Sequence, residues 1–284
     1  MQWLNFEIDG QIHCGLLENG QVWPVQPGCL SAILPNLDEK KTAARSGKSY
    51  AISSVNIRQP VIRPGKILGI GLNYAAHAAE SVSFIKFDTP SVQKWFNKQS
   101  TAANGPGGAI HVPRVSDQLD YEAELVVIIG KHGRHVPSER AMDIVAGFAC
   151  GCDVSVRDWQ KASQTMIMGK GFDTHAPFGP FLVTPDEVGE LAGLGIRGYV
   201  NGELRQQAKL GDMIHDIPAQ IAHLSAAFTL EPGDVIFTGT PAGVGAGHTP
   251  PAWLKEGDLV RVEIDKVGTL ENPVIGEPET ARIG

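Results

Sequence analysis

Residues 120–130, which we expect to form one β-strand, are the stretch of this sequence that most constrains the fold. Residues 125–129 form a continuous apolar run rich in β-branched side chains, which is typical of a strand covered on both faces. Glu122 and Glu124 come just before that run, and because side chains alternate along a strand, both project from the same face. Buried ionised carboxylates need a cation or hydrogen-bond donors to offset their desolvation. We therefore expect a hard divalent metal ion here; the alternative is a strand end that has already reached solvent.

The composition limits the kind of protein that this chain can be. A chain of 284 residues with 42% hydrophobic residues can bury a large core, and a formal net charge of −7 without a basic block argues against nucleic acid or an anionic membrane surface as the partner. No apolar run approaches the ~18 residues of a membrane-spanning helix, and the N-terminus lacks a signal pattern, so we expect a cytoplasmic protein. The cysteines show neither the density of a disulfide scaffold nor a metal-binding spacing, so we assign them no chemistry. They are Cys14, Cys29, Cys150 and Cys152.

Turn and breaker residues divide the chain into two expected domains. Short strands with a hairpin turn at residues 18–20 indicate a small N-terminal β-domain over residues 1–60, and the prolines near residue 60 place the boundary to a larger domain over residues 61–284. In the larger domain the Asn201-Gly202 turn predicts a hairpin. The expected strands are residues 3–8, 11–17, 21–25, 66–74, 146–156, 196–200, 203–207, 235–238, 259–264 and 269–275, and the expected helices are 75–80, 138–145, 157–168 and 214–228.

His77 and Glu80 lie three positions apart on the helix expected after residues 66–74. That spacing puts both side chains on one helical face, within contact distance of each other. Such a pair is often an ordinary surface contact. Here it follows a buried strand at a strand-to-helix turn, where the sites of α/β proteins usually form, so we take it as a candidate catalytic pair.

The segment after this helix has no clear period. Residues 81–108 contain glycines, prolines and aromatic side chains, and we expect them to form a lid that closes over the site.

Further polar residues interrupt the middle of the chain. Asp153 is a third carboxylate in an apolar setting, inside the strand expected over residues 146–156. Arg157 and Gln160 share one face of the helix that follows, and Lys170 stands between two glycines without the pattern of a phosphate loop.

Together these segments resemble the fumarylacetoacetate hydrolase family, in its branch of acylpyruvases and 2-hydroxyhepta-2,4-diene-1,7-dioate isomerases. The matching motifs follow the family's order over residues 64–275, and residues 1–60 match only loosely, as a small N-terminal β-domain that such members often carry. One departure is Gly171, where many relatives place a serine. The motifs are Gly71-Leu72-Asn73-Tyr74-x-x-His77-x-x-Glu80, Asp120-Tyr121-Glu122-x-Glu124-Leu125, Asp153-Val154-Ser155-x-Arg157-Asp158-x-Gln160, Gly169-Lys170-x-Phe172-Asp173, Asn201-Gly202 and Thr238-Gly239-Thr240-Pro241-x-Gly243-Val244-Gly245.

The resemblance implies a β-rich α+β fold, a roll of mixed β-sheets of the family's C-terminal type, and a homodimer. It implies that Glu122, Glu124 and Asp153 coordinate one Mg²⁺ or Mn²⁺, with Ca²⁺ as a further option. The residue types agree, because a ligand set of carboxylates without cysteine or histidine suits these hard cations and suits zinc poorly. The other implied roles are a general-base dyad of His77 and Glu80, a catalytic Lys170, and substrate binding by Arg157, Gln160 and Thr240.

The reaction that we expect is hydrolysis of a C–C bond in an acylpyruvate-like 2,4-dioxo acid through a metal-bound enolate. The ion would stabilise the enolate, and His77, oriented by Glu80, would deprotonate the attacking water. The same groups serve a keto–enol tautomerase or a decarboxylase of a 2-oxo acid such as oxaloacetate. We place hydrolysis ahead of both, because it needs a base that activates water. A non-enzymatic metal-binding or scaffold protein is a distant alternative, since it would leave the dyad and the lysine idle.

Overall fold

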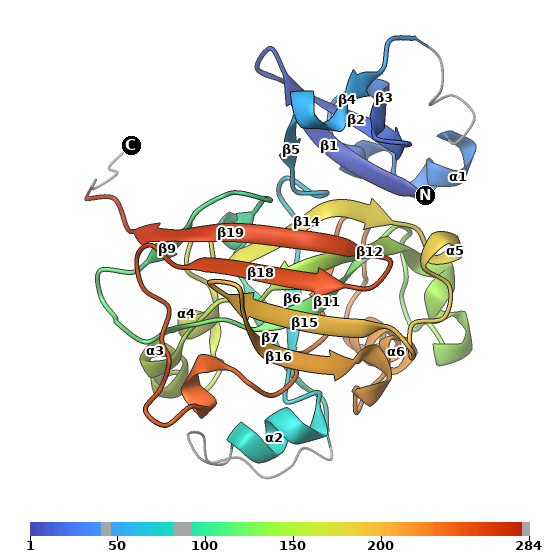
Figure 1. Cartoon of the computed structure of the whole chain (residues 1–284). Helices are drawn as coiled ribbons and strands as arrows, with labels where there is room; N and C mark the ends of the chain where they lie inside the picture. Colours follow the sequence, from blue (N-terminus) through green and yellow to red (C-terminus); the bar gives the residue numbers. More distant parts are fainter. Residues whose placement is uncertain (41–46, 82–91, 280–284) are drawn as a thin grey trace.

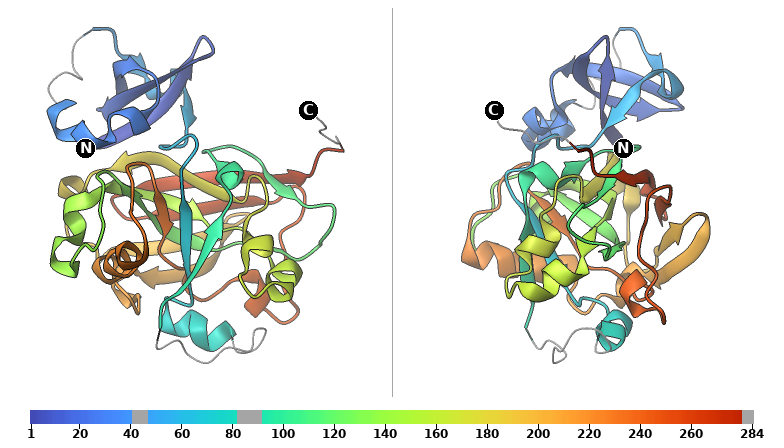
Figure 2. Two further views of the ribbon diagram at one scale, coloured as in Figure 1. Left: turned by 180° about the vertical axis from the view of Figure 1, so that it is seen from behind. Right: turned by 90° about the vertical axis from the view of Figure 1, so that its left-hand side faces the viewer.

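The computed structural model of the protein describes residues 1–40, 47–81 and 92–279. The described chain consists mainly of strands, which form two sheets and a short two-stranded ladder (Figures 1 and 2). Both strand directions occur, since β6 (Ile67–Gly71) runs parallel to β17 (Val235–Phe237) while most neighbours are antiparallel. The expected β-rich α+β class with mixed sheets is confirmed.

β11 (Ala123–Ile129) lies in the middle of the larger sheet, between β12 (Val145–Cys152) and β17. Its odd-numbered side chains from Leu125 onward enter the core between the two sheets, and its even-numbered ones from Val126 onward enter a second core toward the N-terminal strands. The prediction of a strand covered on both faces is therefore confirmed. Its expected start is wrong, because Leu119–Asp120 forms a separate strand, β10, that pairs with β13.

The larger sheet continues on both sides of β11. Its strand order is β4-β3-β2-β1-β14-β12-β11-β17-β6-β7, with β5 beside β1 and β8 beside β14. Because β1 pairs with β14, the N-terminal strands extend the sheet of the larger unit; the division at residue 60 stays a prediction, although Figure 1 shows β1 to β5 gathered at one end. The strands not yet bounded are β1 Gln2–Ile8, β2 Gln11–Glu18, β3 Gln21–Pro27, β4 Tyr50–Ala51, β5 Asn56–Arg58, β7 Lys94–Lys98, β8 Ala103–Asn104 and β14 Ala176–Val183.

The smaller sheet has the order β16-β15-β18-β19-β9 and packs against the odd-numbered face of β11. The hairpin predicted at the Asn-Gly turn joins β15 to β16 and is confirmed. Asn201 and Gly202 have φ values of 53° and 80°, the left-handed conformation that a two-residue turn of this kind requires. The bounds are β9 Ile110–Val112, β15 Gly195–Val200, β16 Glu203–Lys209, β18 Leu259–Ile264 and β19 Gly268–Gly276.

Helical segments are short and lie at the margins of the sheets (Figure 1). The helix expected over residues 157–168 is divided, because Ser163 takes an extended conformation after Ala162 and Met166 takes a left-handed φ of 59° before the second helix. The strand expected over residues 146–156 is interrupted at Asp153 and resumes as β13 (Ser155–Val156). No helix in the described part of the chain is long and apolar enough to cross a membrane. The helices are α1 Leu37–Lys40, α2 Ala75–Ser81, α3 Arg157–Ala162, α4 Ile167–Lys170, α5 Pro185–Val188 and α6 Ile217–Ala227, and Ser138–Ile144 is a 3-10 helix.

The lid expected over residues 81–108 is only partly testable, because residues 82–91 lie outside the described residues. From Lys94 onward the expectation of an irregular loop is wrong. β7 pairs antiparallel with β6 over its whole length, and Phe96 is buried. A strand of five residues with a lysine at each end and an asparagine beside the second has too little apolar character for its period to be recognised.

We expect Leu125→Ala to lower the free energy of unfolding by about 2–5 kcal/mol, because Leu125 is fully buried and its truncation leaves a cavity. Leu204→Ala is the matched control: this strand leucine is 46% exposed, and we expect a change within about 0.5 kcal/mol. Urea unfolding curves measure both. Equal losses in the two variants would contradict the core position of Leu125.

Candidate active site

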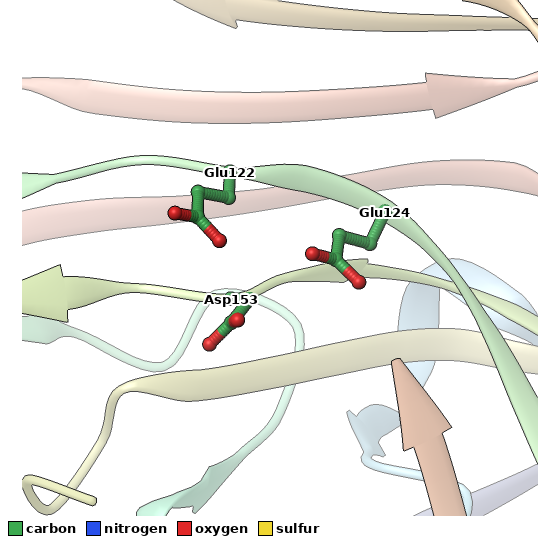
Figure 3. Close-up of side chains that lie close together, drawn as sticks. All are labelled: Glu122, Glu124 and Asp153. Carbon is green, nitrogen blue, oxygen red and sulfur yellow. The ribbon is translucent and has the colours of Figure 1, made fainter. Parts of the chain in front are cut away.

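Glu122, Glu124 and Asp153 form an acidic triad at the ends of two paired strands. Glu122 directly precedes β11 and Asp153 directly follows β12, and the Asp153 N–H donates to the Glu122 carbonyl at 2.9 Å, which continues the pairing. The three carboxylates point toward one another (Figure 3), and one oxygen from each lies within 4.8 Å of the others. The exposed fractions are 4%, 1% and 0%, so the alternative of a strand end in solvent is wrong.

Two buried lysines compensate part of this negative charge. Lys170 Nζ donates to Glu122 Oε2 at 2.7 Å and to Asp153 Oδ2 at 2.5 Å, whereas Lys98 Nζ donates to Asp153 Oδ1 at 2.5 Å and to the Val154 carbonyl at 2.9 Å. Burial opposes the charge on Lys170, but Asp153 and Glu122 outweigh it and raise its pKa. Burial dominates at Lys98 and lowers its pKa, against the attraction of Asp153.

Arg157 is the third cation beneath the pocket. Its Nε donates to Asp120 Oδ2 at 2.8 Å, its Nη1 donates to Gln160 Oε1 at 2.9 Å, and its Nη2 lies 2.6 Å from Glu122 Oε1. The guanidinium is thus held between two buried carboxylates, which is a strong, directional arrangement. Lys98, Arg157 and Lys170 are called the floor cations below.

The two glutamates of the acidic triad differ in their electrostatic surroundings. Burial raises the pKa of Glu122, but Lys170 and Arg157 outweigh it and hold that pKa well below its usual range. Burial raises the pKa of Glu124 well above its usual range, and the neighbouring Asp153 and Glu122 add to the rise. The cluster therefore has its least compensated charge at Glu124, where a divalent cation would relieve the repulsion.

The predicted dyad lies on α2, over the acidic triad. His77 Nδ1 lies 3.1 Å from Glu80 Oε2, and His77 is only 5% exposed, so the alternative of an ordinary surface pair is wrong. The buried Asn73 anchors the start of the helix, since its Nδ2 donates to the carbonyls of His215 at 2.9 Å and Thr238 at 2.8 Å. Helical spacing thus predicts the pair of His77 and Glu80, and the fold brings this pair to the site.

Thr240 lies at the end of the strand-to-loop segment after β17. Its hydroxyl donates to the Ala123 carbonyl at 2.9 Å and accepts from Gln206 Nε2 at 2.8 Å. Because the hydroxyl proton is used within the chain, Thr240 would offer a substrate an acceptor rather than a donor from this group.

The loop of residues 239–247 connects the acidic triad to the dyad. Its backbone N–H groups donate to three carboxylates: Gly239 to Glu124 at 2.7 Å, Gly243 to Glu80 at 3.0 Å, and Gly245 and Ala246 to Asp120 at 2.6 and 3.0 Å. Gly243 has a φ of 104°, and a Cβ there would lie 2.0 Å from a backbone oxygen, so only glycine fits.

Most of the predicted site residues line a single pocket. Glu80 and Asp153 lie just behind it, where Glu80 contacts His77 and Asp153 contacts Lys170. The predicted residues that line the pocket are His77, Glu122, Glu124, Arg157, Gln160, Lys170 and Thr240.

The structure adds residues that sequence reasoning missed. Lys98 was missed because its segment had been taken for a loop. Gln206 is buried in β16; its Nε2 donates to Thr240 and to the Pro241 carbonyl, and its Oε1 accepts from the Ala123 N–H at 2.9 Å. The only signal for Gln206 was a polar side chain next to the Asn-Gly turn, which does not distinguish it from the exposed Gln207.

Gly171, the departure from the family pattern, does not loosen Lys170. Its φ of −106° is open to any residue, and a Cβ there would lie 2.9 Å from the Ile167 carbonyl. This position therefore requires a small residue because of the close contact, and not because of its backbone conformation. The Lys170 ammonium is fixed by its two carboxylate partners and lies 4.6 Å from the centre of the Phe96 ring.

A pocket with buried carboxylates and lysines at its floor and a His-Glu pair over it has the composition of the active site of a small-molecule enzyme. The model of the family "fumarylacetoacetate (FAA) hydrolase C-terminal" matches residues 66–275, and the chain belongs to this family. The resemblance inferred from the motifs is therefore confirmed.

Named relatives extend the comparison. A mitochondrial oxaloacetate tautomerase of Xenopus laevis is 43% identical over 225 residues, which is 78% of this chain and 69% of that protein. An oxaloacetate tautomerase of Bacillus subtilis is 42% identical over 227 residues, 79% of this chain and 75% of that protein. The crystal structure of a maleylpyruvate hydrolase from a Sphingobium species, in complex with manganese(II) and pyruvate, has a TM-score of 0.81 at 30% identity and covers 98% of this chain and 100% of that chain.

We expect Gln206→Leu to lower the free energy of unfolding by about 2–4 kcal/mol, because it leaves the buried Ala123 N–H and the Pro241 carbonyl without partners. Gln207→Leu, at the exposed neighbouring position, is the control and should change it by less than about 0.5 kcal/mol. Thermal or urea unfolding measures the difference. A Gln206→Leu variant as stable as its control would contradict a stabilising role for the hydrogen bonds of Gln206.

Proposed function

We propose that the protein is a metal-dependent keto–enol tautomerase of oxaloacetate or a closely related 2-oxo dicarboxylic acid. Two relatives that match most of the chain bear the name oxaloacetate tautomerase, which supports the tautomerase alternative better than the hydrolysis of acylpyruvates that the sequence led us to place first. The observation that carries the proposal is that His77 on α2 and Lys170 on α4 line one pocket, each held by a carboxylate partner.

Tautomerisation needs one group to take a proton from carbon and another to stabilise charge on oxygen. Because Glu80 engages Nδ1 of His77, the neutral ring carries its proton there and leaves Nε2 to accept one. Lys170, whose pKa is raised, keeps its positive charge in the same pocket.

We further propose that the acidic triad holds one Mg²⁺ or Mn²⁺, with Ca²⁺ as a further option. The fit rests on the donor set, since three carboxylates within 4.8 Å of one another offer only hard oxygen ligands, and on the raised pKa of Glu124, which reflects unbalanced negative charge. When bound, the ion would polarise the 2-oxo carboxylate end of the substrate and so acidify the hydrogens at C3.

His77, Glu80 and Lys170 have different roles in the proposed proton transfer. His77 Nε2 takes a proton from C3 as the C2–C3 double bond forms, and Glu80 orients the ring and stabilises its positive charge. One proton leaves C3 and one arrives at the C2 oxygen, so the net change is a proton transfer within the substrate. Lys170 offers an N–H toward that oxygen, and the buried pocket floor keeps bulk water away from the exchanging protons.

Hydrolysis of a dioxo acid is the second candidate. The maleylpyruvate hydrolase named above shares the fold over its whole length, and the same histidine would deprotonate water instead of carbon. Oligomeric state and cellular location stay predictions, and one relative is named as mitochondrial.

The test is a direct comparison of substrates with the Mg²⁺- or Mn²⁺-loaded protein. We expect it to accelerate the enol-to-keto conversion of oxaloacetate, followed by ultraviolet absorbance, without forming pyruvate. In parallel, acylpyruvates in H₂¹⁸O should release no labelled carboxylic acid beyond an enzyme-free control. Release of labelled acid from an acylpyruvate, with no acceleration of the tautomerisation of oxaloacetate, would contradict the proposal and favour a C–C hydrolase.

Metal binding should release protons. Glu124 must ionise in order to bind a cation, and its raised pKa means that it holds its proton to a higher pH than an ordinary carboxyl group does. Affinity for Mg²⁺ or Mn²⁺ should therefore rise with pH, because fewer protons have to be displaced. Isothermal calorimetry in buffers of different ionisation enthalpy measures the release, and Glu124→Gln should remove it. Proton release that is equal in the wild type and in Glu124→Gln would contradict this assignment.

We expect His77→Ala to lower kcat by about 10²–10⁴-fold, because positioned general bases contribute that much, while metal affinity stays near that of the wild type. His223→Ala, at an exposed histidine of α6, is the matched control and should leave kcat unchanged. Glu80→Gln should reduce kcat by a smaller factor, through lost orientation of the ring. A near-normal rate in His77→Ala would remove His77 from the mechanism.

A further inference from the structure

One face of β7 runs from the floor of the pocket to its wall. Side chains alternate along a strand, so Lys94, Phe96 and Lys98 share a face. Lys98 contacts Asp153 at the floor, Phe96 lies under the Lys170 ammonium, and the half-buried Lys94, the first residue of the strand, lines the pocket. The Cα atoms of Lys94 and Lys98 are about 13 Å apart at the usual strand rise, so Lys94 belongs to the end of the pocket remote from Asp153.

Ser81 adds a polar group to the same pocket from α2. It lies four residues after His77, hence on the same helical face, and it also lines the pocket. Ser81 is 2% exposed, and within the described part of the chain its hydroxyl has no hydrogen-bond partner. A buried hydroxyl without a partner in a pocket wall is a group that a ligand would satisfy.

The charges of the pocket floor are suited to one carboxylate of a substrate and not to two. The acidic triad and Asp120 bring four buried carboxylates, and the floor cations bring three positive charges. A divalent ion would leave a single net positive charge, which one substrate carboxylate neutralises. A second carboxylate needs a further cation, and Glu80 beside the pocket makes that need greater.

We propose that Lys94, assisted by the Ser81 hydroxyl, binds the distal carboxylate of a dicarboxylic 2-oxo acid and so makes the pocket selective for diacids. Arg157 and Lys170 contact Glu122 of the acidic triad, and Lys94 lines the same pocket from the first residue of β7. The inference rests on the proposed function, since it assigns the 2-oxo carboxylate end of the substrate to the acidic triad and the distal end to the wall. Lys94 is thus a specificity-determining residue rather than a member of the proton-transfer machinery.

The binding test uses the Mg²⁺-loaded protein and three unreactive ligands: 2-hydroxysuccinate, its 4-methyl ester and oxalate. The ester replaces the distal carboxylate with a neutral methyl ester, and oxalate has no distal group. By calorimetry we expect Lys94→Gln to weaken the diacid about tenfold, Ser81→Ala about threefold, and neither to alter the ester or oxalate by more than about twofold. Lys94→Arg should keep most of the preference, and Lys131→Gln, at an exposed lysine, should change nothing.

The kinetic arm compares oxaloacetate with its 4-methyl ester in the same variants. Lys94→Gln should raise KM for oxaloacetate about tenfold and leave kcat, and both constants for the ester, nearly unchanged. Equal losses for diacid and ester, or no loss for either, would overturn the assignment of Lys94. Failure of the proposed function looks different: the wild type would bind the diacid in preference to the ester but would not accelerate tautomerisation of oxaloacetate. A wild type that binds diacid and ester equally would also overturn the inference.

Discussion

The burial of four carboxylates against three cations is the constraint on which this structure depends. Ionised groups removed from water are tolerated only when their partners are fixed in position, because desolvation otherwise exceeds the attraction between them. The partners come from parts of the chain far apart in sequence: Lys98 from β7, Arg157 from α3 and Lys170 from α4. The site therefore exists only when the larger sheet is complete and both short helices are docked beside it.

The loop of residues 239–247 makes the site a single unit. Its N–H groups bind Glu124 of the acidic triad, Glu80 of the dyad and Asp120, the partner of Arg157. Displacement of this loop would shift the proposed base, a proposed metal ligand and a floor cation together. Several glycines are needed here because the backbone itself approaches the carboxylates: a Cβ at Gly247 would lie 2.2 Å from Glu80 Oε1.

The parts of the site that could be predicted are those encoded by local patterns. Alternation along a strand placed Glu122 and Glu124 on one face, and helical spacing paired His77 with Glu80. Lys98 and Gln206 could not be found this way, because their importance comes from contacts across the sheet with Asp153 and Thr240. The break between α3 and α4 was missed because it depends on the extended conformation of Ser163 and on the left-handed conformation of Met166, a residue type that rarely adopts it.

The proposed divergence of reactions within one family is compatible with this division of the pocket. Tautomerisation, decarboxylation and C–C hydrolysis of oxo acids all develop negative charge on a carbonyl oxygen, so a floor of carboxylates and cations suits each of them. The choice of substrate must then be determined by side chains outside this network of carboxylates and cations. In the described chain those groups belong to α2 and to the outer end of β7, which contribute Ser81 and Lys94. Because neither residue holds the acidic triad in place, these positions can change between relatives at little cost to the stability of the floor, and the distal end of the substrate is where such relatives should differ.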